Sequence, residues 1–483
     1  MSTDLLQTLF SNVWSIFLVV LFFGGSIFVH ELGHFLAARR RGVVVERFSI
    51  GFGPPIFSRK GKDGVEYRVS WIPLGGYVLL PQLADLGPIE GRSEVDVEKL
   101  PPISYSTRMI VFVAGAVFNL LFAFALACVI WLIGQPESSE TATTRLGYIS
   151  RTLESDGKKI PSPAAEAGLR VGDIVRAIDG SKVNNWLDIQ YLIGLGAGQS
   201  ADGQRKALFT VERDGKLIDL TVNPVLVGEE RERRVGIAPG YELIVQQVTP
   251  DSAADQAGIK AGDQILTIDG VPVMSAGTYY DLLEASPDRP LVFTVRRGIG
   301  EGAITLPSTI PPRQNAKTAA NIGLTLTTGF QLIHVSPVAQ ISDQITKTFQ
   351  TLWSLLNPHS DVGLSKVSGP VGIVRIFHSA AEAGIRMSLI FAILVNVNLA
   401  IFNLLPLPVL DGGQMLFATI GKIRGRPLPA NFIIAAQSTF GLLLLAMVLY
   451  VSVFDVRRWA RDARNDRAVA PVEQTATSST DSK

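Results

Sequence analysis

The sequence predicts a polytopic α-helical membrane protein: four transmembrane helices, two tandem α+β domains and a membrane-entering β-hairpin. Three observations predict this fold class. Hydrophobic residues make up 47% of the 483 residues and charged residues only 18%, whereas soluble domains usually carry about 25% charged residues. Four apolar runs are long enough to cross a bilayer, which takes about 20 residues. One segment recurs at a constant offset of 90 residues, which predicts a repeated domain.

Composition excludes two kinds of protein. The formal net charge is +1, so the chain lacks the broad positive field of a nucleic-acid-binding protein, and no nucleic-acid partner is expected. The single cysteine, Cys128, permits neither an intramolecular disulfide nor a cysteine zinc cluster. Any metal site would therefore use histidine, aspartate and glutamate. The first apolar run is too long, and lacks the basic flank, to be a cleavable signal peptide.

The four predicted spans cover residues 14–38, 109–133, 387–410 and 432–453. The chain then divides into an N-terminal membrane part (1–135), two α+β domains (145–228 and 232–312), a linker with an amphipathic membrane-surface segment (313–385), a C-terminal membrane part (386–456) and a disordered tail (457–483). Residues 65–69 and 71–80 predict a hairpin. Its tip is apolar, so we expect it to enter the membrane rather than lie in water.

The recurring segment runs from Ser162 to Gly180 and again from Ser252 to Gly270. Each copy predicts a short helix, a Gly-Asp turn, a strand and an Asp-Gly turn, a pattern that resembles a PDZ domain. PDZ domains bind peptides by adding a strand to a sheet edge, and the expected ligand loops are Gly147, Tyr148, Ile149, Gly236 and Ile237. Two interpretations stay open, namely capture of a peptide ligand or a filter that blocks bulky substrates.

The first span carries the motif His30-Glu31-Leu32-Gly33-His34. On a helix, residues four apart share a face, so both imidazoles can reach one ion. Zinc accepts neutral imidazole, and a catalytic zinc keeps a position for water. Glu31 can take the proton of that water as general base and pass it to the leaving amine. Placing an ionisable group at membrane depth costs roughly several kcal/mol, so such groups indicate function rather than packing.

Two histidines do not complete a catalytic zinc site. Asp411 is the best third ligand, because it lies at membrane depth beside Pro406 and Pro408 with Gly412-Gly413 behind it. A turn or helix-capping aspartate at the membrane border is an equally good interpretation of that residue on sequence grounds alone. The remaining histidines are expected to be ordinary polar residues, namely His334, His359 and His378.

These motifs resemble the site-2 protease family of intramembrane metalloproteases. The resemblance rests on His30-Glu31-x-x-His34 and on Asn403-x-x-Pro406-x-Pro408-x-Leu410-Asp411-Gly412, and covers nearly the whole chain. It implies one Zn²⁺ ion, with Asp411 as the third ligand. It also implies that Asn403, Pro406 and Pro408 hold the substrate, and that the hairpin residues Gly75, Gly76 and Tyr77 present it as an extended strand.

The family resemblance implies regulated intramembrane proteolysis. The expected substrates are single-span membrane proteins already cut outside the membrane, such as anti-sigma factors or signal-peptide remnants. Basic residues at 39–41 and at 422–426 predict that both loops are cytoplasmic, which puts the PDZ-like domains on the periplasmic side of an inner membrane. Four arginines after the fourth span conflict with this orientation: Arg457, Arg458, Arg461 and Arg464.

Two other classes of protein compete with the protease. A membrane-anchored PDZ scaffold with a dead site is less favoured, because His30, Glu31, His34 and Asp411 are all present. A transporter with a broken helix around a metal fits the spans alone. It does not explain a glutamate between two histidines, and there are too few spans.

Overall fold

The computed structural model describes residues 3–83, 99–155, 157–196, 198–199, 203–286, 289–298, 304–311, 322–363 and 366–469. The chain forms two compact units. The first, called the membrane unit, combines Met1–Ile133, Val335–Thr346 and Leu364–Lys483. The second, called the repeat unit, combines Gly134–His334 and Lys347–Gly363.

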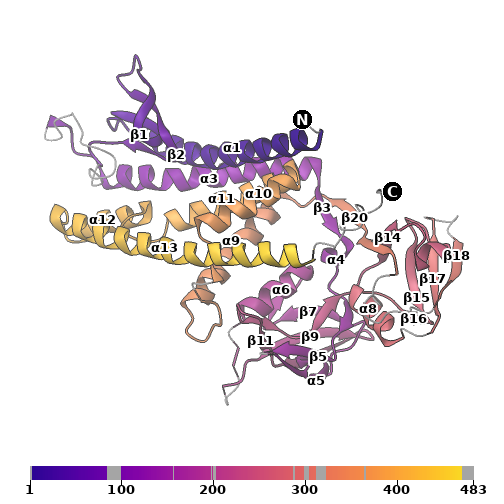
Figure 1. The fold of residues 1–483 in the computed structure, drawn as a ribbon. Helices are drawn as coiled ribbons and strands as arrows, with labels where there is room; N and C mark the ends of the chain where they lie inside the picture. Colours follow the sequence, from indigo (N-terminus) through magenta and orange to yellow (C-terminus); the bar gives the residue numbers. More distant parts are fainter. Residues whose placement is uncertain are drawn as a thin grey trace, which may run out of the picture. The chain divides into compact units, whose positions relative to one another are not determined.

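The membrane unit is mainly helical, and Figure 1 shows its long helices α1, α3, α11 and α13 running in nearly the same direction. Its helices are α1 (Thr3–Arg40), α3 (Tyr105–Ile133), α10 (Pro370–Glu382), α11 (Ile385–Asn403), α12 (Asp411–Ile423) and α13 (Ala430–Val469). Four segments are long and apolar enough to cross a membrane: Val13–Arg40, Tyr105–Ile133, Ile385–Asn403 and Ala430–Asp462. The prediction of four helices that could span a membrane is confirmed.

Two helix ends differ from the prediction. The third span ends at Asn403 rather than near residue 410, because Pro406 and Pro408 lack the amide hydrogen that a helix needs. A separate helix, α12, then begins at Asp411. The predicted disordered tail is also wrong in its first part. The helix α13 continues to Val469, and only residues 470–483 of that prediction lie outside the described residues.

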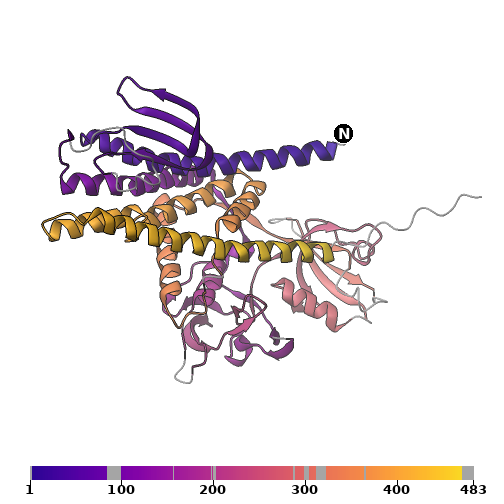
Figure 2. The ribbon, with the colours of Figure 1, turned by 60° about the vertical axis from the view of Figure 1, so that its left-hand side comes forward.

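Two long bent strands, β1 (Arg47–Lys60) and β2 (Glu66–Leu79), form a sheet beside α1. Figure 2 shows this sheet in indigo. Residue Arg47 aligns with both Glu66 and Leu79, so the strands bend and the first part of β1 lies between two segments of β2. The predicted hairpin between 65–69 and 71–80 is therefore wrong in its pairing, since both segments lie in β2 and pair with β1. The apolar side chains Ile56, Phe57, Trp71 and Ile72 are exposed.

The repeat unit contains two α+β domains. The first comprises β4 (Leu146–Ile149), β5 (Thr152–Ser155), β6 (Lys158–Pro161), α5 (Pro163–Glu166), β7 (Ile174–Ile178), β8 (Ser181–Lys182), α6 (Trp186–Leu195), β9 (Ala207–Arg213), β10 (Lys216–Val222), β11 (Val225–Val227), β12 (Glu232–Arg234) and β13 (Ile237–Pro239). The second comprises β14 (Leu243–Val248), α7 (Ala253–Gln256), β15 (Gln264–Ile268), β16 (Val271–Pro272), α8 (Ala276–Ala285), β17 (Leu291–Arg297), β18 (Ile304–Ile310) and β19 (Leu324–Thr328).

Four further elements connect these domains to the rest of the chain. The strands β3 (Gln135–Ser138) and β20 (Phe330–Ile333) pair with each other, and α4 (Ser139–Ala142) follows β3. The helix α9 (Pro337–Leu356) covers the predicted amphipathic segment 340–356. It exposes apolar side chains such as Phe349 and Trp353, as expected of a helix with one apolar face.

The two domains repeat the same internal ion pair, which supports the repeat predicted from sequence. Arg213 donates two hydrogen bonds of 2.7 Å to the carboxylate of Asp173, and it donates a third to the carbonyl of Gly168. Arg297 makes the same contacts with Asp263 and with the carbonyl of Gly258. In both copies the carboxylate is buried, so the guanidinium is the group that compensates its lost hydration.

The predicted domain ends at 228 and 312 are too early. The strand β13 pairs with β4, and Val235 lies in the first core, so the first domain extends to Pro239. Ile322 lies in the second core, and β19 pairs with β14. The predicted linker therefore includes the last strand of the second domain. Terminal strands of this kind escape prediction because their partners lie far away in the sequence.

Candidate metal centre

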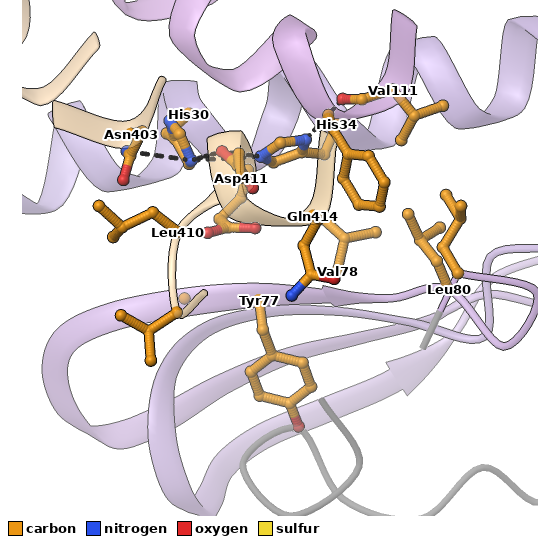
Figure 3. Close-up of a pocket in the computed structure, with 15 residues that line it drawn as sticks. His30, His34, Tyr77, Val78, Leu80, Val111, Asn403, Leu410, Asp411 and Gln414 are labelled. Atoms are coloured by element: carbon orange, nitrogen blue, oxygen red, sulfur yellow. Dashed lines mark hydrogen bonds and ion pairs between the residues drawn. The ribbon is translucent and has the colours of Figure 1, made fainter. Parts of the chain in front are cut away.

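Three side chains bring their ligand atoms together inside the membrane unit. His30 and His34 lie one turn apart on α1, with their Nε2 atoms 3.2 Å apart. Asp411, the first residue of α12, places its Oδ2 atom 3.3 Å from each of these nitrogens. Figure 3 shows the three side chains converging. In the part of the chain that the structure describes, this is the one such cluster of three metal-ligating side chains.

The position of Asp411 depends on the turn that precedes it. The helix α11 ends at Asn403, and the chain then folds back so that α12 packs tightly on the intervening segment. A Cβ atom added to Gly412 would lie 2.3 Å from the carbonyl oxygen of Leu405, and one added to Gly413 would lie 2.0 Å from that of Leu407. The two glycines therefore permit close packing, which fixes the backbone of the neighbouring Asp411.

The donor set fits a zinc ion. Four ligands at about 2.0–2.1 Å in a tetrahedron lie about 3.3–3.4 Å from one another, and the three atoms of this cluster are 3.2–3.3 Å apart. The Oδ2 atom of Asp411 is buried and has no hydrogen-bond partner, although a buried carboxylate oxygen normally has one. Two imidazoles and a carboxylate also match the ligand types of catalytic zinc sites, which leave the fourth position for water.

The helix α3 packs directly against both histidines. The Nδ1 atom of His34 lies 2.8 Å from the carbonyl oxygen of Val111. The side-chain amide of Asn119 lies 3.3 Å from Nδ1 of His30. Between them, a Cβ atom on Gly115 would lie 2.4 Å from Nε2 of His34. These contacts hold both rings with Nε2 directed at Asp411.

Glu31 faces the same cavity, which has a volume of about 210 Å³. Val78 on β2 lines the same cavity. Gly76 lies so close that an added Cβ atom would be 3.0 Å from Cγ of Glu31. The carboxylate is thus held between α1 and the edge of the sheet, beside the three ligand atoms.

The structure brings together seven of the predicted site residues in the cavity wall: His30, Glu31, His34, Gly76, Tyr77, Asn403 and Asp411. Gly75, Pro406 and Pro408 are not part of this wall. Gly75 has a φ of 129° and packs on the ring of Phe52. That ring stacks on the ring of Tyr77, with their centroids 6.1 Å apart. The two prolines lie in the turn before α12 and so shape the site from outside it.

The five predicted ligand-loop residues lie in the repeat unit. Gly147, Tyr148 and Ile149 lie in β4, which pairs with β13, and their role as ligand-loop residues stays a prediction. The hydroxyl of Tyr148 further donates to Asp281 on α8, at 2.9 Å. Gly236 and Ile237 lie instead at the end of the first domain, where Ile237 begins β13.

Several residues contribute to the site without having been predicted from the sequence. Val78, Val111 and Gln414 line the cavity, and Asn119 contacts His30. Backbone contacts such as that of Val111 leave no mark in a sequence. A signal for Asn119 did exist, since it is the one side-chain amide in the apolar run 109–133, and polar groups inside a span usually serve packing or function.

Four helices that could span a membrane, and a His–His–Asp cluster with a glutamate beside it, are the features of an intramembrane metalloprotease. The comparisons with known proteins agree with this class. The chain belongs to peptidase family M50, whose sequence model matches residues 17–447. The predicted resemblance to site-2 proteases is therefore confirmed, and the chain is a metalloendopeptidase of a zinc-dependent family.

The relatives align along nearly their whole length. The regulator of sigma-E protease RseP of Escherichia coli is 30% identical over 476 residues, which cover 91% of this chain and 98% of the relative. A putative zinc metalloprotease of Xylella fastidiosa is 30% identical over 464 residues, with 91% and 98% covered. One of Vibrio cholerae is 30% identical over 447 residues, with 86% and 92% covered.

Proposed function

We propose that this protein cleaves the transmembrane segments of single-span membrane proteins at one zinc ion held by His30, His34 and Asp411. The observation that carries the proposal is the convergence of these three ligand atoms at 3.2–3.3 Å. Two of them lie on a helix that is long and apolar enough to span a membrane. A substrate that reaches them must itself enter the bilayer.

The chemistry divides between the ion and Glu31. A bound zinc ion lowers the pKa of water toward about 7 and polarises a carbonyl group. The carboxylate of Glu31 takes a proton from the attacking water as the new carbon–oxygen bond forms. It then gives that proton to the amide nitrogen as the carbon–nitrogen bond breaks. The close approach of Gly76 to the Glu31 side chain keeps the carboxylate beside the three ligand atoms for both transfers.

The substrate would bind as an extended strand beside β2. A helix hides its peptide bonds, so a transmembrane substrate has to unwind before hydrolysis, and pairing with a sheet edge holds it extended. The segment of β2 at Gly76 and Tyr77 lines the cavity. The side-chain amide of Asn403 also lines it, about 3.5 Å from Nε2 of His30. It is placed to bond the backbone of a bound strand.

The substrate class follows from the relatives. Because one of them is named a regulator of sigma-E protease, we propose membrane-tethered anti-sigma factors or signal-peptide remnants, shortened first by another protease. The enzyme would lie in the inner membrane with the two domains of the repeat unit in the periplasm. These domains act as PDZ domains, either as a size filter or through peptide capture. Capture would use β13, because its second edge has no partner strand among the described strands.

The proposal is tested with a single-span reporter, truncated on its periplasmic side and co-expressed with wild type, Glu31→Gln or Asp411→Asn. Loss of the general base is expected to slow cleavage by about 10²–10⁴-fold. The purified Glu31→Gln protein should keep its zinc, whereas Asp411→Asn should lose much of it. Glu382→Gln, which alters an exposed carboxylate on α10, serves as the matched control. Equal cleavage by all four proteins at equal abundance would refute the proposal.

A further inference from the structure

One face of α3 is shaped by the two histidine rings. Val111, Gly115 and Asn119 follow one another at intervals of four residues, which puts them on the same side of the helix. Val111 offers its carbonyl oxygen to His34, Gly115 offers space, and Asn119 offers its side-chain amide to His30. Each contribution differs chemically, yet all three act on the rings that hold the ligand atoms.

The contact between His34 and Val111 shows which ring nitrogen of His34 carries the proton. A backbone carbonyl accepts but does not donate, so the Nδ1 atom that lies 2.8 Å from the Val111 oxygen carries the ring proton. The Nε2 atom of His34 then keeps its lone pair, which is the form that binds a metal ion. A hydrogen bond from the other ring nitrogen is how proteins commonly fix the tautomer of a metal-binding histidine.

His30 needs an equivalent acceptor. Its Nε2 atom faces Asp411 and His34, so a metal-binding His30 carries its proton on Nδ1. Among the described residues, the group at hydrogen-bond distance from Nδ1 is the amide of Asn119, at 3.3 Å. The amide nitrogen would donate to Nδ1 and would force the proton onto Nε2, toward the ligand atoms. The amide oxygen accepts from Nδ1 and leaves Nε2 free.

The orientation with the nitrogen toward His30 leaves a buried acceptor of Asn119 unpaired. The residue is fully buried, and its Oδ1 atom has no hydrogen-bond partner when the nitrogen faces His30. Oxygen and nitrogen of an amide are similar in size, and the hydrogen-bond network decides which of them faces a neighbour. With the oxygen toward His30, the unpaired acceptor gains a donor and the ring takes its metal-binding tautomer.

We propose that Asn119 is a positioning residue of the metal centre, whose amide oxygen accepts Nδ1–H of His30 and so directs the lone pair of Nε2 to the metal ion. The inference rests on the metal site proposed above. It adds a residue from the second span to a site whose ligands come from α1 and α12. Asn119 touches neither substrate nor metal, and acts only through His30.

The test measures zinc affinity rather than proteolysis. Purified full-length protein is stripped of zinc and titrated in competition with a chromophoric chelator. Asn119→Leu fills a similar volume without an acceptor, and its zinc affinity is expected to fall about 10–100-fold, as for other partners of metal-binding histidines. Asn119→Asp keeps an acceptor for Nδ1–H and should bind zinc nearly as tightly as wild type. The visible spectrum of the cobalt-substituted protein should change in the leucine variant only.

The matched control is Asn396→Leu. Asn396 is likewise a fully buried amide in a span, but its nitrogen donates to Ser26 and to the carbonyl of Ala392 rather than to a histidine. Its zinc affinity should stay at the wild-type value, which separates a tautomer effect from the general loss of a buried amide. Unfolding of each apo protein is followed by circular dichroism. If Asn119→Leu does not fold, Asn119→Ala removes the amide without adding bulk.

Two outcomes would overturn the inference. One is wild-type zinc affinity in a folded Asn119→Leu or Asn119→Ala protein. The other is an Asn119→Asp protein that folds but binds zinc as weakly as the leucine variant, because packing rather than an acceptor would then matter. Failure of the proposed function is recognised separately. In that case wild type binds zinc with the predicted dependence on Asn119 but leaves the membrane reporter uncut.

Discussion

Replacing Gly115 by alanine should disable the metal centre while leaving the fold intact. The added Cβ atom would lie 2.4 Å from Nε2 of His34 and 2.6 Å from Cε1 of His30. Real Cβ contacts are essentially never shorter than 3.0 Å, so the rings and the α3 backbone have to separate by about 1 Å to reach ordinary van der Waals distance. The ligand atoms would then no longer match the 3.2–3.3 Å spacing that fits zinc.

The size of the effect follows from that displacement. Overpacking by one methyl group typically costs about 1–3 kcal/mol, which a helix partly recovers because alanine is favoured over glycine by about 1 kcal/mol. The protein should therefore fold. A misplacement of about 1 Å at a reacting centre costs about 10²-fold in rate, and zinc affinity should fall with it. Zinc content of the purified protein and cleavage of the truncated reporter measure the two effects.

The control is Gly24→Ala, which also alters a glycine in a membrane-spanning helix but has nothing within 4 Å of the added Cβ atom. It should keep both zinc and activity. A Gly115→Ala protein with full zinc content and wild-type cleavage would refute the idea that Gly115 makes room for the two rings. Equal losses in both variants would instead assign the effect to glycine replacement in a span, and not to contact with the histidines.

Two further predictions concern the turn before α12 and the repeat unit. Gly413→Ala should displace Asp411 and lower zinc content, because its Cβ atom meets the Leu407 oxygen at 2.0 Å, whereas Gly421→Ala, with a nearest contact of 3.5 Å, should not. Arg213→Leu leaves Asp173 buried without its partner and should destabilise the first domain by about 3–5 kcal/mol. Limited proteolysis measures this loss. Arg176 is more exposed, so Arg176→Leu should have little effect. Burial opposes ionisation of Asp173, but the hydrogen bonds from Arg213 lower its pKa below 3.8, so this stability is complete above that pH and is lost as pH falls through the lowered pKa. Equal protease resistance of the two arginine variants, or zinc loss in Gly421→Ala, would contradict these predictions.

The parts of the site that sequence predicts are those carried by local spacing. His30 and His34 share a helix face because they are four residues apart, and apolar length marks their helix as a span. Local spacing does not assign a role to Asp411. Its neighbours suggest a metal site, but a helix-capping role fits equally well unless the family motif is considered. The structure supplies the distance that sequence lacks, 3.3 Å from the carboxylate to each imidazole.

The parts of the site and of the fold that escape prediction depend on which distant segments of the chain contact each other. Val111 contributes a carbonyl oxygen, which any residue could supply, and so has no sequence signature. Gly236 follows a turn-like segment, which favours assigning the strand after it to the second domain. That strand is β13, and its pairing with β4 shows that it belongs to the first domain. Residues 65–80 resemble a local hairpin because nothing in the sequence indicates that β1 and β2 bend and pair twice.

The arginines after the fourth span show how such contacts change an interpretation of charge. Their number opposes the predicted orientation, if each is counted only as a topology signal. In the structure, Arg458 donates to Asp455 at 2.8 Å and to the carbonyl oxygen of Val367 at 3.0 Å, while Asp455 also accepts from the backbone of Gly372. Asp455 is buried, so an uncompensated carboxylate at this depth would be costly, and a cation beside it is required by packing. Arg458 therefore has a structural reason to follow the fourth span on either side of the membrane, and it carries less weight against a periplasmic position of the repeat unit.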